Sequence, residues 1–529
     1  MKGGFRLSMA WLHTWCGLVC GWLLCAIFFT GTLSVFRAPL TRWMEARPIV
    51  AASPGAGQVP RQALDHLAHE AAGARFWRIE LPQQPGDALL LAWQPAGGNR
   101  GSQRMVAMEP ASGALLPIPW GRKTEGGRHF MTFHYTLLAG MPGFWLVGAL
   151  AIGMLVALVS GVVVHRRIFA DFFTFRPGKG QRSWLDAHNA SAVLALPFLF
   201  MIAYTGVAFF YTSYMPWPLQ AVYGTDGKAY GRYQSELAHH PAPPRRALAG
   251  TAAPLHDLAP LLEQAQELTG LAARMVVIER PGDASATVRV YSRAPEESRT
   301  VITPPSDVSF DGVSGQVLQL RRPEPEAPYS TEQVHQAIEA LHVASFGGWT
   351  IRWLYFFCGC LGTVMMATGT ILFMVKRRRK SAMEFGAATA PFYRAAEALN
   401  VAAFAGIALA SVGYLWANRL LPAGLPGRDA WEVRGFLGLW LLSLLHAALR
   451  PGKRAWVEQL GLASVLCLGL PLLNHGTAGQ HLGIYLQAGD WQRAGVELGA
   501  IALGAVLACM AVHVRRGWQR SPAQRHRSA

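Results

Sequence analysis

The sequence predicts a polytopic α-helical membrane protein with about eight transmembrane helices and an internally duplicated two-helix unit. Of its 529 residues, 51% are apolar and only 15% are charged, which is typical of a chain that lies largely in lipid. Apolar runs long enough to cross ~30 Å of hydrocarbon recur along the chain. Histidines and Ser/Thr-Gly pairs recur at equal spacings in two parts of it, which indicates the duplication. Two polar segments are expected to form small α+β modules.

The apolar runs and the segments between them set the expected order of elements. Four membrane helices come first, at residues 1–36, 143–165, 189–215 and 347–375. They alternate with a first module at 37–142, a cytoplasmic loop at 166–188, a second module at 216–346 and a basic cytoplasmic loop at 376–394. A C-terminal extension at 395–514 is expected to add four helices, and it is followed by a tail at 515–529.

Basic residues indicate the orientation in the membrane. The net charge is +17, and basic residues gather beside helix ends, for example at Lys2, Arg6 and residues 376–380. By the positive-inside rule these ends face the cytoplasm, so both termini are expected to be cytoplasmic and both modules periplasmic. This pattern accounts for the charge without a nucleic-acid partner, and it predicts a multi-pass membrane protein. The first apolar run is longer than a cleaved signal and is expected to remain as a helix.

The two polar segments repeat one arrangement. In each of them, alanines and leucines at helical spacing predict a helix, at 62–72 and at 258–272. Alternating apolar residues then predict strands, at 89–93, 105–108, 275–278 and 287–291. The closing turns match, because VAMEPASG at 106–113 and VSFDGVSG at 308–315 place an acidic residue, a turn-forming residue and a glycine in the same order. The two segments therefore support the duplication independently of the histidines.

Two histidines share one spacing and one expected depth. His13 precedes Thr30-Gly31 by 17 residues, and His188 precedes Thr205-Gly206 by the same 17. The orientation places both histidines at the cytoplasmic ends of their helices. Two imidazoles from different helices at one depth can supply both axial nitrogens to a haem iron, each ring being held by its other nitrogen. We therefore expect a haem between them.

Two further histidines share a second spacing. His134 precedes Ser160-Gly161 by 26 residues, and His342 precedes Thr368-Gly369 by 26. Both lie just before a membrane helix on the periplasmic side, so they predict a second haem. The Ser/Thr-Gly pairs fit close packing of helices through small residues. The sequence contains no Cys-x-x-Cys-His, so both haems should be of the b type.

Other residues near these positions are candidates for the same sites. His165 ends the second membrane helix, where the repeat has Phe373 instead. It is expected to replace a ligand, to line the haem pocket or to mark the entry of electrons. Three arginines stand six or seven residues before one of the histidines, where they suit bidentate contacts with haem propionates: Arg6, Arg182 and Arg128. For any single histidine the alternative is an interfacial residue with a hydrated tip.

Several segments carry more specific motifs, namely residues 6–13 (RLSMAWLH), 165–177 (HRRIFADFFTFRP), 186–189 (DAHN), 341–342 (LH) and 352–355 (RWLY). Together they resemble the PepSY-associated transmembrane proteins, over roughly residues 1–380. That family includes inner-membrane ferric-siderophore reductases, with haem between membrane helices and PepSY modules in the periplasm. The resemblance implies one-electron transfer outward across the membrane, which reduces a ferric siderophore and releases iron(II). The electron donor would be an unidentified cytoplasmic protein or a quinol.

Two other functions are compatible with the sequence. One is a non-redox membrane protein whose modules bind peptide or regulate a protease, and the other is a cytochrome subunit that feeds a separate periplasmic reductase. The C-terminal extension lies outside the repeat, and the sequence leaves open three roles for it: homodimerisation, docking of a quinol or another electron donor, and an iron-related transport step. Glu458 and Glu497 lie in or near its apolar runs, close to predicted helix ends, where we expect them to contact interfacial water.

Overall fold

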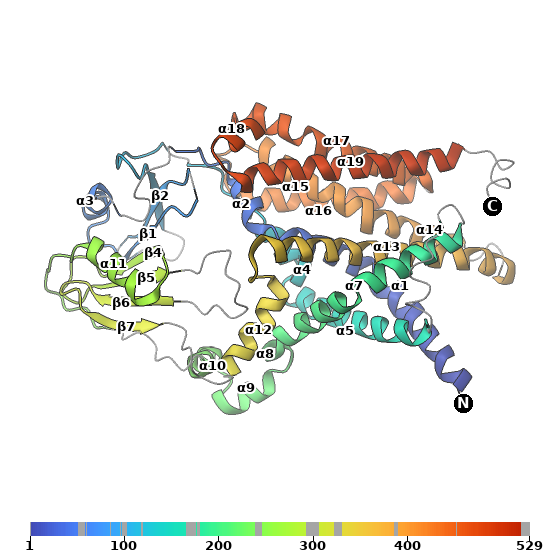
Figure 1. Ribbon diagram of the computed structural model, residues 1–529, viewed down its shortest axis with the longest axis horizontal. Helices are drawn as coiled ribbons and strands as arrows, with labels where there is room; N and C mark the ends of the chain where they lie inside the picture. Colours follow the sequence, from blue (N-terminus) through green and yellow to red (C-terminus); the bar gives the residue numbers. More distant parts are fainter. Residues whose placement is uncertain are drawn as a thin grey trace.

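A bundle of long helices carries a β-sheet domain at one end (Figure 1). The start of α1 (Lys2–Ser34) and the end of α19 (Trp491–Gln519) lie at the other end (Figure 1). We call the two ends the sheet side and the terminus side. The computed structural model describes residues 2–50, 59, 61–84, 86–95, 97, 103–117, 120–165, 176, 180–237, 246–292, 306–321, 331–385, 390–450 and 452–519.

Eight helices within the described residues are long and apolar enough to cross a membrane, as the sequence predicts. The first four are α1, α5 (Gly140–Val164), α7 (Gln181–Phe209) and α13 (Gly348–Phe385). The other four are the continuous helix α14 (Ala390–Val401), η2 (Ala402–Gly406) and α15 (Ile407–Leu420), followed by α16 (Arg428–Leu449), α17 (Lys453–Ala478) and α19. The predicted polytopic helical fold is confirmed.

The helices differ in length from the predicted membrane segments. Helix α7 begins at Gln181 rather than at 189, and α13 continues to Phe385, through basic residues that were expected to form a loop. An apolar run marks only the part of a helix that contacts lipid, and arginine and lysine are good helix formers beyond it. At the sheet side α1 ends at Ser34 and α7 at Phe209, before the predicted 36 and 215. Most of the predicted loop 166–188 before Gly180 lies outside the described residues.

Helices α1, α5, α7 and α13 pack around a shared core. Helix α1 contacts α5 and α13, and α7 contacts the same two helices. Buried side chains from all four meet in one cluster, which includes Phe28, Met154, Leu199 and Met366. At Gly362 an added Cβ would lie 2.8 Å from a methyl group of Leu199, so the glycine permits the close approach of α13 to α7. We call these four helices the duplicated core.

The C-terminal helices form a second bundle beside the duplicated core (Figure 1). The helix from Ala390 to Leu420 is the most deeply buried of the eight spans. It contacts α1 and α13 on one side and α16 and α17 on the other, while α17 packs along α19. Its middle turn, η2, is π-helical, a local widening that often accompanies close packing or function. This helix therefore joins the two bundles.

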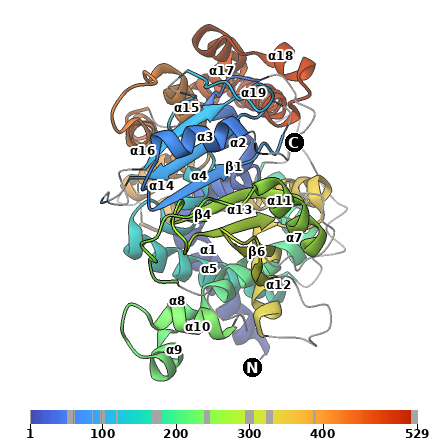
Figure 2. The same ribbon diagram turned by 90° about the vertical axis from the view of Figure 1, so that its left-hand side faces the viewer.

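The two polar modules combine into one antiparallel sheet of seven strands, in the order β3-β2-β1-β4-β5-β6-β7. The first module gives β1 (Phe76–Glu80), β2 (Leu89–Gln94) and β3 (Arg104–Met108), and the second gives β4 (Ala273–Glu279), β5 (Thr287–Ser292), β6 (Ser306–Asp311) and β7 (Val317–Arg321). Strands β1 and β4 pair across the junction, with Trp77 opposite Ile278 (Figure 2). The modules were expected separately, but edge strands expose unpaired amide groups, and this pairing satisfies them.

Each module contributes one helix to the core of the sheet domain. Leu67 of α3 (Arg61–Glu70) and Leu261 of α11 (Leu258–Thr269) lie in one buried cluster with apolar side chains of the strands, including Ile79 and Val290. Helix α3 begins and ends within two residues of its predicted range, and α11 begins where predicted and ends three residues earlier. The predicted strands are all present and extend by a few residues. The domain is thus a sheet with two covering helices of matching origin.

The matching turns adopt matching hydrogen bonds. In the first module the amide of Gly113 donates to the carbonyl of Glu109, and in the second the amide of Gly315 donates to that of Asp311. The two glycines have φ of 68° and 74°, which only glycine adopts without strain. The structure therefore supports the duplication in the sheet domain as well as in the membrane.

Further short helices connect the sheet domain to the bundle, except the last one, which joins α17 to α19. They are α2 (Arg37–Glu45), α4 (Arg128–Thr136), α8 (Tyr211–Tyr214), α9 (Pro216–Tyr223), α10 (Ala229–Leu237), α12 (Thr331–Val343) and α18 (Leu482–Gln487). Two of them carry site candidates, because His134 lies in the last turn of α4 and His342 in the last turn of α12. Both histidines are therefore held by helices that cap the bundle on the sheet side.

Candidate cofactor sites

Each of the four repeated histidines is held by the same local arrangement. The ring nitrogen Nδ1 faces an acceptor on a neighbouring helix of the same half of the chain. The carbonyl acceptors, each at 2.8 Å, are Ala157 for His13, Ile27 for His134 and Met365 for His188. His342 faces the hydroxyl of Thr205 at 3.2 Å, which donates to the carbonyl of Met201 and can therefore accept from the ring. His342 also has a hydrogen bond with the backbone of Ile202. Since these acceptors fix the proton on Nδ1, Nε2 of each neutral ring keeps its lone pair.

The Ser/Thr-Gly pairs provide the surface on which these rings lie. An added Cβ would stand 3.0 Å or less from the ring at each glycine: Gly161 to His13 3.0 Å, Gly31 to His134 2.5 Å, Gly369 to His188 3.0 Å and Gly206 to His342 2.8 Å. For His13, His134 and His188, the carbonyl that accepts from the ring lies three residues before the Ser or Thr of the pair. The hydroxyl of that Ser or Thr donates to a carbonyl one turn earlier in its own helix. We call each arrangement a glycine seat.

The seats are reciprocal within each half of the duplicated core. In the first half, α5 seats His13 of α1, and α1 seats His134 of α4. In the second half, α13 seats His188 of α7, and α7 seats His342 of α12. Helices α1 and α7 each hold a histidine near one end and a seat near the other. Helices α5 and α13 hold only a seat, and the matching histidine lies in the short helix before each of them, α4 or α12. This arrangement explains the repeated spacings.

The seated rings meet in pairs, one from each half. The ring centres of His13 and His188 are 6.3 Å apart, and those of His134 and His342 are 6.0 Å apart. A metal–nitrogen bond of ~2 Å on each side, with ~1 Å from nitrogen to ring centre, puts two axial imidazoles ~6 Å apart. Within the described residues no group of three or more His, Cys, Asp or Glu is arranged to hold a bare metal ion. Two imidazoles suit a metal that arrives with other ligands, as in a porphyrin.

A cavity opens beside the sheet-side pair. It encloses about 1110 Å³, including its open part, and is lined by His134, His342, Arg37, Tyr355 and mostly apolar side chains of the four core helices. Cofactor pockets commonly occupy ~300–1,000 Å³ and have this apolar character. Burial lowers the pKa of His134, and it lowers that of His342 to about 3, so both imidazoles are neutral at physiological pH. The neutral form is the one that binds a metal.

The terminus-side pair has a third histidine beside it. The ring of His165 stands 6.4 Å from that of His13, at an interplanar angle of 80°. His165 directly follows α5, and no glycine seat holds it among the described residues. Two residues before His188, Asp186 is buried and accepts hydrogen bonds from the amide and side chain of Arg176. The seats distinguish His13 and His188 from His165 as a matched pair.

The comparison with known families covers both pairs and all four seats. A family model described as the PepSY-associated TM region matches residues 10–376. This chain belongs to the PepSY-associated transmembrane family. A protein of Pseudomonas aeruginosa that is described as uncharacterized is 25% identical over 418 residues, which cover 74% of this chain and 94% of that protein. The family match ends before α14, so the C-terminal bundle lies outside it.

The predicted arginines of this PepSY-family protein are placed in three different ways. Arg6 is exposed, and its guanidinium donates to the carbonyl of Val164 at 3.2 Å, beside His165. Arg182 is exposed at the start of α7. Arg128 does not line the sheet-side cavity but a second pocket next to it. Arg37 lines both, and sequence analysis missed it, although a basic residue directly after a membrane helix is a recognisable signal.

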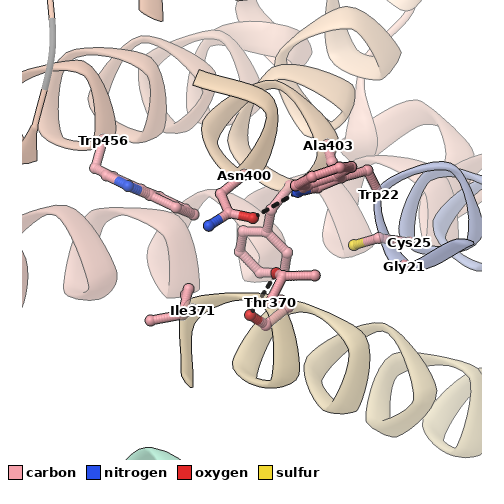
Figure 3. A pocket seen from close by; sticks show the side chains of 10 residues that line it. Gly21, Trp22, Cys25, Thr370, Ile371, Asn400, Ala403 and Trp456 are labelled. Atoms are coloured by element: carbon pink, nitrogen blue, oxygen red, sulfur yellow. Dashed lines mark hydrogen bonds between the residues drawn. The ribbon is translucent and has the colours of Figure 1, made fainter. Parts of the chain in front are cut away.

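The junction between the duplicated core and the C-terminal bundle contains a polar contact. The indole of Trp22 on α1 donates to the side-chain carbonyl of Asn400 on α14 at 2.7 Å, beside a small pocket of about 200 Å³ that Trp456 and Cys25 also line (Figure 3). A buried polar pair of this kind fixes the register of two helices in lipid. The contact therefore joins α1 to α14, between the duplicated core and the C-terminal bundle.

Of the two C-terminal glutamates, one lies where expected and the other does not. Glu458 is partly exposed and pairs with His446 and Arg450, as an interfacial group should. Glu497 is fully buried, and its carboxylate accepts hydrogen bonds from Asn474 at 2.7 Å and Trp43 at 3.3 Å. The expectation of interfacial water was wrong for Glu497, because α2 and α17 cover the first turns of α19 and supply donors that the sequence does not reveal.

Proposed function

We propose that this protein binds two b-type haems and reduces ferric chelates, with ferric siderophores as the expected class, on the sheet side of the membrane. The observation that carries the proposal is the pairing of four seated imidazoles, two at each end of the duplicated core, at ring separations near 6 Å. Interfacial histidines would not require four glycine seats. A bound haem b supplies reversible one-electron chemistry at its iron.

The chain's own residues would prepare both sites for that cofactor. The seats fix the tautomer and aim of each imidazole, as outer hydrogen bonds do for metal-binding histidines generally. Along α1, His13 and Gly31 are 18 residues apart, which corresponds to ~27 Å of helix and nearly the thickness of the hydrocarbon layer. The two pairs therefore stand near opposite faces of the membrane. Electrons would enter near His13 and His188 and leave near His134 and His342.

The distribution of basic residues supports the direction of transfer. Basic side chains cluster on the terminus side, at the ends of α13 and α19, so the positive-inside rule places this end in the cytoplasm. The sheet domain would then lie in the periplasm of a bacterial inner-membrane protein, where ferric chelates arrive. A cytoplasmic protein or a quinol would supply the electrons.

The first test is the visible spectrum of the purified protein, oxidised and dithionite-reduced, with a pyridine haemochrome assay. We expect a six-coordinate b-type spectrum and about two haems per chain, with oxidation of the reduced protein on addition of a ferric chelate. A colourless, folded protein after expression with ample haem would exclude the proposal and favour a non-redox role for the sheet domain. Haem without oxidation by ferric chelates would instead favour a cytochrome subunit that feeds another enzyme.

A further inference from the structure

A second pocket on the sheet side is lined largely by arginine. It lies between α2, the start of α4 and the start of α19, and encloses about 810 Å³, including its open part. Five arginines line it, against two acidic residues, Glu45 and Asp87: Arg37, Arg42, Arg47, Arg128 and Arg493. Such a concentration of guanidinium groups is costly unless anions compensate it.

The nearby carboxylates compensate only some of these guanidiniums. Arg42 pairs with Asp87 and, through Nε at 3.0 Å, with Asp490 behind the pocket wall. Arg47 pairs with Glu45 at 2.9 Å. Burial raises the pKa of Glu45, which weakens its contribution as an anion. Arg128 is exposed to the pocket and makes no ion pair or hydrogen bond with the part of the chain that the structure describes.

Arg493 gives independent evidence that this pocket accepts an anion. Its side chain is 3% exposed, and its Nε and Nη1 atoms are buried without a hydrogen-bond partner among the described residues. Its Nε forms an ion pair with Asp490 at 3.4 Å, without the geometry of a hydrogen bond, and Asp490 also pairs with Arg42. Buried guanidinium donors are nearly always satisfied, so an unsatisfied one that lines a pocket indicates a ligand with acceptor oxygens.

We propose that this arginine pocket binds the anionic oxygen groups of the ferric chelate. The inference rests on the proposed function and specifies its substrate class: chelates with carboxylate or phenolate oxygens and a net negative charge. Arg37 lines both this pocket and the cavity of His134 and His342, so a chelate held here lies next to the sheet-side pair. The planar guanidinium binds two such oxygens at once, which lysine would not do.

The test measures binding without redox chemistry. Isothermal titration of the full-length protein in detergent with Ga(III)–EDTA, a redox-inert anionic chelate, should show binding that weakens with salt. A cationic Ga(III) trihydroxamate should bind more weakly. Arg128→Gln should reduce the affinity for the anionic chelate by ~10-fold, the loss of one charge-assisted contact. Arg61→Gln, which removes an exposed arginine of α3 elsewhere on the sheet side, is the matched control and should bind normally.

The outcomes separate this inference from the proposed function. Equal binding by wild type and Arg128→Gln, or no binding of Ga(III)–EDTA, would overturn the pocket assignment even if the haem-loaded protein reduces iron. Binding of phosphatidylglycerol with no binding of the chelate would overturn it too and assign the pocket to lipid. Binding of the chelate by the wild type that is lost in Arg128→Gln would support the pocket assignment. If the protein then fails to reduce the Fe(III) chelate, only the proposed redox function is contradicted.

Discussion

The two halves of the duplicated core hold their histidines in the same way, but they differ in one residue near the terminus-side end of the second helix. Each half seats one histidine at each end of its helix pair, and the two halves meet ring to ring. After Gly161 the first half places His165 beside His13, whereas the second half places Phe373, which packs on Trp15 with ring centres 6.1 Å apart. The seats are thus common to both halves, and the difference lies outside them. Four predictions test this comparison.

Removing a seated histidine should have the largest effect, and the same one in either half. His13→Ala and His342→Ala should each lower the haem content from about two to about one per chain, since each variant would lack one of the two imidazoles proposed to hold a haem. Reduction of a ferric chelate should be lost in both. His475→Ala, an exposed histidine of the C-terminal bundle, is the control. Unchanged haem content in either variant would exclude that pair as a site.

Filling a glycine seat should weaken cofactor binding although all four proposed histidine ligands remain in the sequence. In Gly31→Ala the new methyl group would stand 2.5 Å from Nδ1 of His134, so the ring must leave the carbonyl of Ile27. We expect ~10–100-fold weaker haem binding at the sheet-side pair, the usual cost of losing an orienting hydrogen bond. Gly17→Ala in the same helix meets nothing within 4 Å and is the control. Titration of the apoprotein with haem would show whether the two variants differ.

Giving the first half the residue that the second half has at the matching position should have a smaller effect. His165→Phe reproduces Phe373 and leaves the seats of His13 and His188 intact. The haem content and the six-coordinate spectrum should stay the same, and only the midpoint potential of the terminus-side site should shift, because a polar neighbour is lost. Redox titration measures the shift. Loss of one haem per chain would instead make His165 a ligand and the two halves unequal.

The smallest effect concerns the matched turns of the sheet domain. The amide hydrogen bond from Ser314, aided by Arg246, lowers the pKa of Asp311 to about 2. A depressed carboxyl pKa stabilises the fold above the unfolded value near 3.8, and this contribution is lost as pH falls towards 2. Asp311→Asn should therefore lower the local stability by ~1 kcal/mol at pH 7. Hydrogen exchange of β6 measures it, and the difference from wild type should shrink in acid.

Glu109→Gln is the counterpart of that variant in the first half. Glu109 accepts a hydrogen bond from the hydroxyl of Ser112, but no arginine pairs with it among the described residues. Its substitution should therefore cost less than that of Asp311. A larger loss of hydrogen-exchange protection in Glu109→Gln than in Asp311→Asn would contradict this ranking of the two turns.

The sequence predicted the parts of this protein that repeat or are local. Eight apolar runs gave eight helices, and the paired turns at Gly113 and Gly315 were recognisable because a positive φ requires glycine. The spacing of the histidines indicated which ones belong together. It did not show that each ring rests on the other helix of its own half, since spacing along one helix says nothing about its neighbour.

Long-range contacts account for what sequence analysis missed. The pairing of β1 with β4 joins strands almost two hundred residues apart, and no local pattern specifies it. Arg37 was overlooked because its importance comes from two cavities that only the folded chain forms. The burial of Glu497 likewise depends on Asn474 and Trp43, donors from two other helices.

The strand pairing between Trp77 and Ile278 also bears on how such a molecule is assembled. A single half would present β1 as a free edge and one lone imidazole at each end of its helix pair. It would need to find a second copy before any site was whole, and its assembly would depend on concentration. Two halves on one chain meet by folding alone. Each half can also change independently of the other, as the difference between His165 in the first half and Phe373 in the second illustrates.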